Sequence, residues 1–215
     1  MNQPTIFKRR FRRILCTFMP WFFPHLGRGV TVSSHWNTIT ADNFDALEPA
    51  SIVLLDEIVS VASSKNDSIL DMGCNVGRHL NYLHGKGFHN LRGVDFSDRA
   101  VKDMQERYPE MYRDSTITVA SFQDFLKAGS EQVDIVYTRG ATFELVPAAF
   151  PLIESVCRIS KKYVILVISE FGHAYPRCWE YEFARAGFEL VHLKRPAAPE
   201  TPEHQVSLMT FKRLT

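Results

Sequence analysis

From residue 68 onward, short apolar runs alternate with segments of helical periodicity, and this alternation strongly limits how the chain can fold. We expect strands over residues 68–72, 91–96, 116–120, 133–138, 163–169, 188–193 and 205–212. Helices are expected over residues 44–63 (with Asp42 or Asn43 as the cap), 77–84, 97–108, 147–159 and 179–186. Strands that alternate with helices form a mostly parallel sheet that is covered on both faces.

The last two expected strands depart from this alternation because no helix separates them. A loop containing Pro196, Pro199 and Pro202 joins them, and this favours an antiparallel hairpin at the edge of the sheet. The pattern therefore predicts an α/β fold of three layers, with a seven-stranded, mostly parallel sheet and an antiparallel last strand. Residues 42–215 would form this domain, which is long enough to bury a sizeable core.

The charge distribution separates an N-terminal arm, residues 1–41, from this domain. The arm holds six Lys or Arg residues and no acidic residue, whereas the rest of the chain holds 19 basic and 24 acidic residues, a net charge of −5. Residues 14–26 are rich in Phe, Trp, Ile and Leu, but Pro20 and Pro24 interrupt them. Three interpretations stay open: a segment that packs on its own domain or covers the active site as a lid, a membrane-interface segment over residues 8–26, and a targeting segment.

The most informative motif is Ile-Leu-Asp-Met-Gly-Cys-Asn-Val-Gly at residues 69–77, between an expected strand and an expected helix. Gly73 permits a tight turn and Gly77 a close approach at the start of the helix. Asp71, at the end of the strand, can accept a hydrogen bond from a ligand ammonium group. Asp95 closes the next strand, 18 residues after Gly77, where a carboxylate can accept hydrogen bonds from both hydroxyls of a ribose. Together these residues predict a site for a nucleoside-containing ligand.

In order and spacing, these elements resemble the class I (Rossmann-like) S-adenosylmethionine-dependent methyltransferases over about residues 68–170. In that family the first loop follows an acidic-x-Gly-x-Gly-x-Gly pattern, and Asn75 stands here at the middle glycine. The resemblance implies methyl transfer with S-adenosylmethionine as the cofactor. It implies that the methionine part is surrounded by residues of the first loop: Asp71, Gly73, Cys74, Asn75 and Gly77. Asp95 would bind the ribose, and the adenine would be bounded by Phe96, Ser121 and Phe122. Arg139 would flank the cofactor.

A closer resemblance involves residues 133–140, 146–147 and 158–165. These segments resemble methyltransferases associated with sugar and surface-polysaccharide biosynthesis. That group often has a histidine where this chain has Glu144, so the catalytic role of this position stays open. The resemblance implies a small-molecule acceptor, such as a sugar, glycolipid or other metabolite, that is methylated on oxygen or nitrogen.

Candidate catalytic groups follow the fourth and fifth expected strands, at the edge where open α/β sheets bind their ligands. Glu144 is one candidate base, with helix capping as the alternative. His173 is another, because the pKa of histidine suits proton transfer; the alternative is an ordinary surface histidine. Arg139 and Tyr175 are candidates for substrate contact. Trp36 is a third, because the family places a segment over the cofactor there, with core packing as the alternative.

The cysteines and histidines predict neither a disulfide nor a metal site. The four cysteines form no CxxC pair, which favours reduced thiols in the cytosol. His79 and His84 are five positions apart and not four, as in a helical metal-binding pair. No apolar run reaches the roughly 20 residues that a membrane span needs. We therefore expect a cytoplasmic enzyme without a metal, and peripheral membrane contact stays open.

Two alternative functions remain beside small-molecule methylation. A nucleic-acid methyltransferase could use the basic arm on phosphates, but residues 42–215 show no basic stripe. The Asn/Asp-Pro-Pro-Tyr/Phe loop of amino-methylating DNA enzymes is also absent, since Thr138-Arg139-Gly140 stands there. The other alternative is a non-catalytic, membrane-associated scaffold with a methyltransferase-like fold. Asp71, Gly73, Gly77 and Asp95 argue against lost cofactor binding, although they do not speak to catalysis.

Overall fold

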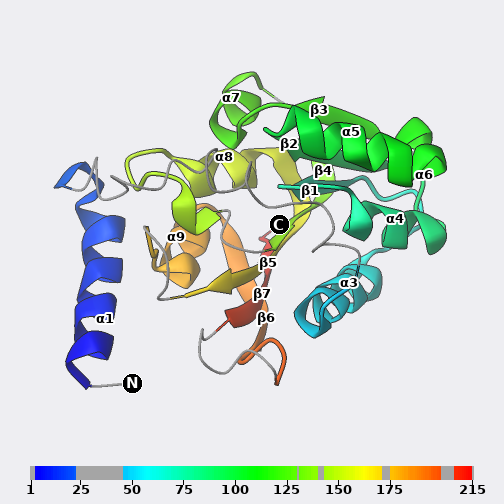
Figure 1. Ribbon diagram of the computed structural model, residues 1–215. Helices are drawn as coiled ribbons and strands as arrows, with labels where there is room; N and C mark the ends of the chain where they lie inside the picture. Colours follow the sequence, from blue (N-terminus) through cyan, green and yellow to red (C-terminus); the bar gives the residue numbers. More distant parts are fainter. Residues whose placement is uncertain are drawn as a thin grey trace.

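The structure is a computed structural model, and it describes residues 3–22, 46–129, 131–139, 143–170, 175–199 and 206–214. Its strands are β1 (Ile69–Met72), β2 (Leu91–Asp95), β3 (Thr116–Val119), β4 (Val133–Arg139), β5 (Ser160–Ser169), β6 (Phe188–Lys194) and β7 (Val206–Arg213). They form one seven-stranded sheet in the order β3-β2-β1-β4-β5-β7-β6. Strand β7 is antiparallel to β5 and β6, and the other pairs are parallel. The expected fold class is confirmed (Figure 1).

Helices cover both faces of this sheet. The helices on one face are α3 (Pro49–Val61), α4 (Arg78–Gly85), α5 (Asp98–Arg107) and α6 (Pro109–Asp114). Those on the other are α7 (Phe122–Lys127), α8 (Leu152–Ile159) and α9 (Trp179–Arg185). Successive strand residues alternate between the two cores, so Ile165 packs with the α3–α6 layer and Leu166 with the α7–α9 layer. This alternation requires a sheet that is buried on both faces.

Two helices begin later than expected, and two short helices were not expected. Helix α3 begins at Pro49 with Glu48 as its N-cap, so Asp42 and Asn43, which lie outside the described residues, do not cap it. Pro49 suits this first helical position because its fixed φ is helical and a first-turn N–H has no partner to lose. Helix α8 begins at Leu152, after Pro151, and not at residue 147. Helices α6 and α7 were not expected, because each has only six residues.

The N-terminal arm contains a long helix that the sequence pattern did not predict. Helix α1 spans Gln3–Phe18, and the short 3-10 helix η1 (Pro20–Phe22) follows it. Figure 1 shows α1 beside α9, at one side of the molecule. Among the described residues, no helix combines the length and the apolar character that crossing a membrane requires.

Candidate active site

The loop between β1 and α4 has a backbone that few residue types can adopt. Gly73 has a φ of 90°, Asn75 of 46° and Gly77 of 78°, all in the left-handed region. Asparagine is one of the few residues with a side chain that enters this region routinely. This preference allows Asn75 to stand where the family pattern has its middle glycine.

Gly77 is also required by close packing. A Cβ atom built at this position would lie 2.6 Å from Cγ and 2.9 Å from Sδ of Met104 on α5. Gly77 is the N-cap of α4, so its small size lets the start of α4 approach α5. The first N–H groups of α4 therefore lie beside the loop, at the end of a helix that attracts negative charge.

Asp95 joins the loop after β1 to the end of β2. Its Oδ2 accepts a hydrogen bond from the backbone N–H of Asn75 (2.9 Å), and its Oδ1 accepts one from the backbone N–H of Ser97 (2.9 Å). Burial raises the pKa of Asp95, and these backbone donors oppose the rise. Each carboxylate oxygen has two lone pairs, so Asp95 can also accept hydrogen bonds from ligand hydroxyls.

Asp71 places a carboxyl group at the buried end of β1. The residue is 1% exposed. Neither carboxylate oxygen makes a hydrogen bond of normal geometry with a described residue, but the neighbouring buried Tyr137 side chain favours the charged form of the carboxyl group. Nδ1 of His79 lies 3.8 Å from Oδ2. Burial raises the pKa of Asp71 to about 7. Because a buried carboxyl group without a donor is costly, the arrangement fits a ligand that brings a donor or a positive charge.

His79 cannot supply that charge near neutral pH. Its Nε2 lies 3.1 Å from Oγ of Ser51 on α3. Burial, aided by the positive charges of Arg78 and Arg139, lowers the pKa of His79 to about 3. His79 therefore stays neutral, and it helps to pack α4 against α3.

The residues expected around the adenine lie at the ends of β2 and β3. Phe96 and Phe122 are half-buried, and the Phe122 ring meets the Phe143 ring edge-on, with 6.1 Å between centroids. Ser121 is the N-cap of α7: its Oγ accepts a hydrogen bond from the backbone N–H of Asp124. These aromatic and polar groups follow neighbouring parallel strands, as a base-binding edge requires.

Cys74 differs from its neighbours in the loop, because its side chain points into the core. It is 4% exposed and belongs to the core on the α3–α6 face. Burial raises the pKa of the thiol well above its ordinary value, so the thiol stays protonated. Only the backbone of Cys74 can therefore face a ligand.

Arg139, at the end of β4, pairs with Glu48, the N-cap of α3. The Arg139 side chain is 18% exposed. This ion pair ties the start of α3 to the sheet edge that carries Asp71. The expected contact of Arg139 with a cofactor or an anionic substrate stays a prediction.

Glu144 lies deep between the ends of β4 and β5, in the 3-10 helix η3 (Phe143–Leu145). It is 0% exposed, and its Oε1 accepts a hydrogen bond from the backbone N–H of Ser169 (2.7 Å). Its Oε2 has no hydrogen-bond partner among the described residues, and burial raises the pKa of Glu144 to about 8. The carboxyl group joins the two strand ends and does not cap α8, which begins at Leu152.

Tyr175, a candidate for substrate contact, packs under the N-terminal helix. It is 4% exposed and forms a small buried cluster with Cys16 and Ala148. Its backbone N–H donates to the carbonyl of Glu144 (2.8 Å). His173 and Trp36 lie outside the described residues, so the predictions for both stay untested.

Comparison with known proteins relates this chain to a protein family. A family described as "Methyltransferase domain" matches residues 69–162, from β1 to the start of β5. Over these residues the chain matches a methyltransferase domain, and its sheet has the class I methyltransferase fold. No curated protein matches the chain by sequence.

Solved structures share the fold of this methyltransferase domain at low identity. Magnesium protoporphyrin IX methyltransferase from Synechocystis PCC 6803, solved with bound SAH, is 14% identical, with a TM-score of 0.61 over 76% of this chain and 83% of that one. The N-methyltransferase NodS from Bradyrhizobium japonicum WM9 is 13% identical, with a TM-score of 0.62 over 78% and 98%. A TehB-like SAM-dependent methyltransferase from Corynebacterium glutamicum ATCC 13032 Kitasato is 15% identical, with a TM-score of 0.59 over 85% and 96%.

Two residues beside Asp71 were not among the site candidates from the sequence. The Tyr137 side chain is fully buried, and burial, with the neighbouring Asp71 carboxylate, raises its pKa well above the ordinary value. Arg78 opens α4 and donates to the carbonyl of Ala46 (2.9 Å). A basic residue at a helix N-terminus opposes the helix dipole, and this local conflict was the available signal for Arg78. Tyr137 gave no signal, because an aromatic residue in a buried strand is ordinary.

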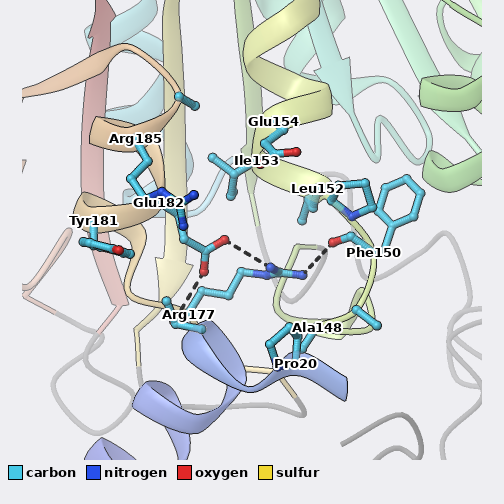
Figure 2. Close-up of a pocket in the computed structure, with 14 residues that line it drawn as sticks. Pro20, Ala148, Phe150, Leu152, Ile153, Glu154, Arg177, Tyr181, Glu182 and Arg185 are labelled. Carbon is cyan, nitrogen blue, oxygen red and sulfur yellow. Dashed lines mark hydrogen bonds and ion pairs between the residues drawn. The ribbon is translucent and has the colours of Figure 1, made fainter. Parts of the chain in front are cut away.

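A separate pocket of about 250 Å³ lies between α1, α8 and α9. Figure 2 shows Arg177 stretched along it, and Arg177 donates to Glu182 (3.2 Å) and to the carbonyl of Pro147 (3.1 Å). Its walls come from Thr17 and Pro20 of the arm, the loop after β4, the start of α8, and Arg177 with helix α9. None of its lining residues belongs to the loop after β1 or to the end of β2. The pocket is therefore distinct from the site around Asp71 and Asp95.

No metal site is apparent in the part of the chain that the structure describes. There, no three His, Cys, Asp or Glu residues are grouped so that they could hold a metal ion. His84, one of the two histidines considered above, lies 3.1 Å from Oδ2 of Asp114. That pair connects α4 to α6 at the surface.

Proposed function

We propose that this domain methylates an oxygen or nitrogen atom of a small-molecule acceptor, with S-adenosylmethionine held at the ends of β1 and β2. The observation that carries the cofactor assignment is the buried Asp71 carboxyl group, whose oxygens make no hydrogen bond of normal geometry with a described residue, beside a left-handed loop that Asp95 ties down. In this arrangement Asp71 and the backbone of residues 73–77 hold the methionine part. Asp95 accepts from the ribose, and Phe96, Ser121 and Phe122 bound the adenine.

The cofactor supplies an activated methyl group, so the main task of the protein is to hold the acceptor in line with it. We assign acceptor binding to the loops after β4 and β5, because ligands of open α/β sheets lie beyond the carboxyl ends of the strands. A sugar, a glycolipid or another metabolite with a hydroxyl or amine is the class of acceptor we propose.

Two features of the surface argue against a nucleic-acid acceptor. Apart from the arm, the chain has a net charge of −5, which repels phosphates. Within the arm, Arg13 faces the carboxylates of Glu170 and Glu180 (3.5 and 2.8 Å). This side chain serves to attach α1 to the domain.

Two residues are candidates for the base that removes a proton from the substrate, Glu144 and His173. Glu144 is enclosed, and with a pKa of about 8 it holds its proton at neutral pH. A base must reach the proton that it removes, so the described position of Glu144 suits a positioning residue that connects β4 to β5. His173 follows β5 and remains our candidate for the base.

Cofactor binding is tested by calorimetric titration of the full chain with S-adenosylmethionine and S-adenosylhomocysteine. We expect Asp95→Ala to weaken both affinities at least about tenfold, because a charged hydrogen-bond acceptor is lost. Asp98→Ala is the matched control: its side chain is 65% exposed and pairs with Lys102 at the surface, so its affinities should equal those of the parent. A folded parent protein that binds neither compound would refute the cofactor assignment.

Acceptor class is tested separately, with S-adenosylmethionine carrying a labelled methyl group. The parent protein is incubated with sugar, glycolipid and metabolite fractions, and in parallel with RNA, DNA and protein fractions. Label in a small-molecule fraction that Asp95→Ala abolishes would support the proposal. Label confined to nucleic acid or protein would overturn the acceptor assignment, and cofactor binding without transfer to any fraction would favour the scaffold interpretation.

A further inference from the structure

Helix α1 presents its apolar side to the solvent and its polar side to the domain. Phe11, Ile14 and Phe18 recur at spacings of three and four residues, so they lie along one side of the helix. They are 54%, 50% and 48% exposed, and Trp21, just beyond the helix, is 66% exposed. We call these four residues the outward stripe. A helix that packs on a globular domain ordinarily turns such a stripe inward.

The opposite side of α1 attaches to the domain through the buried Cys16, which packs with Tyr175 and Ala148, and through polar contacts. Arg13 pairs with Glu180 (2.8 Å) and lies 3.5 Å from the fully buried Glu170. Thr17 accepts a hydrogen bond from the backbone N–H of Cys178 (2.8 Å) and donates to Glu182 (3.3 Å). These contacts fix the rotation of α1 about its own axis, and they hold the outward stripe away from the core.

Charge on the outer side of α1 has a single sign. Lys8 and Arg10 are exposed, and at about 100° per residue they fall on either side of the outward stripe. The arm contains no acidic residue. The neighbouring Glu180 and Glu182 are engaged by Arg13 and by Arg177. Tyr181 of α9, 43% exposed, continues the apolar surface, since its ring lies 4.9 Å from that of Phe18.

We propose that α1 docks the domain on a membrane surface with anionic headgroups, with the outward stripe in the interface. An apolar stripe flanked by basic residues is the pattern of helices that lie in the plane of a membrane interface. Trp21 suits this depth because indole combines an apolar ring with a polar N–H group. The lysine and arginine side chains can reach the headgroups while their stems follow the apolar surface. This docking does not depend on the acceptor that the domain methylates.

The test is co-sedimentation of the full chain with vesicles of phosphatidylcholine, with and without phosphatidylglycerol. We expect binding to the anionic vesicles that weakens as salt is raised. The variant Phe11→Ser/Ile14→Ser/Trp21→Ser should lower the partition constant at least about tenfold, because apolar area drives interfacial binding. The control Ile52→Ser/Val191→Ser removes exposed apolar side chains on α3 and β6, 42% and 48% exposed, and should bind like the parent.

A second pair of variants tests the charge without touching the stripe. Lys8→Gln/Arg10→Gln should lose most of the binding that phosphatidylglycerol adds, whereas Lys127→Gln/Lys194→Gln, which changes two exposed lysines elsewhere, should keep it. These variants keep the test valid if the serine variant fails to fold. No vesicle binding by the parent, or equal binding by all variants, would overturn the proposal. Stripe-dependent dimers in light scattering without vesicle binding would also overturn it, because a second copy would then cover the stripe.

Discussion

Buried ionisable side chains determine the electrostatics of the sheet edge. Asp71 and Glu144 lie at the ends of β1 and β4–β5, and burial raises their pKa values to about 7 and about 8. His79 shows the reverse effect for a base, since burial lowers its pKa to about 3. In each case burial penalises the charged form. Burial therefore favours the neutral forms of these three groups, and a cationic ligand would favour ionisation of Asp71.

Replacing Glu144 should change how stability depends on pH. Below about pH 4.5, its ordinary pKa, the carboxyl group is protonated in both the folded and the unfolded state. As pH rises toward about 8 the unfolded state loses this proton while the folded state keeps it, so the parent loses stability. Glu144→Gln removes this loss, which amounts to a few kcal/mol (order of magnitude) in the free energy of unfolding between about pH 4.5 and about pH 8.

Urea denaturation of both proteins at several pH values measures the difference between their pH slopes. The difference isolates Glu144, because Asp71 and His79 contribute to both proteins. Glu154→Gln is the control, since Glu154 is exposed on α8 and its replacement should keep the slope of the parent. Identical slopes for the parent and Glu144→Gln would show that the carboxyl group is not protonated in the fold.

At the scale of elements, the loop after β1 and helix α4 act as one unit. Three left-handed residues shape the turn, and Asp95 connects it to β2 through the N–H of Asn75. Gly77 then starts α4 in contact with Met104 of α5. The conformation of the loop therefore depends on packing between two helices as well as on its own sequence.

Gly77→Ala should disturb this unit. The added Cβ meets Met104 at 2.6 Å, at a φ of +78°, so we expect a loss of about 1–3 kcal/mol in the free energy of unfolding. Affinity for S-adenosylhomocysteine should fall with it, because the loop must shift. Gly85→Ala, in the same helix, has nothing within 4 Å of its Cβ, and it should be neutral or add up to about 1 kcal/mol. Thermal melts and calorimetry measure both variants, and equal behaviour of the two would contradict the packing argument.

At the scale of the whole molecule, a buried carboxylate links the arm to the sheet. Glu170, fully buried after β5, receives hydrogen bonds from Ser207 of β7 and from Arg195 after β6. Its other oxygen lies 3.5 Å from Arg13 of α1. A buried carboxylate needs such partners, because removing charge from water is costly. Attachment of α1 therefore depends on residues from the far end of the chain.

Arg13→Gln should loosen α1 and leave the domain folded, since Glu170 keeps Arg195 and Ser207. We expect amide hydrogens of α1 to exchange at least about tenfold faster, because the docked state loses its ion pairs. Arg10→Gln, which changes an exposed residue of the same helix, should leave exchange unchanged. Hydrogen exchange followed by mass spectrometry measures both variants. Equal exchange in the two variants would mean that Arg13 does not hold the helix.

The residue pattern by itself determined the strands, most of the helices, the antiparallel end of the sheet and the loop after β1. Each of these depends on short-range periodicity, turn-forming residues and the spacing from Gly77 to Asp95, which a linear sequence displays. Tertiary structure decided the ion pair of Arg139 with Glu48, the burial of Glu144 and the outward orientation of α1. These features join residues that lie far apart in the chain, and burial raises the pKa of Glu144. Local periodicity carries no information about which distant side chain will remove a group from water.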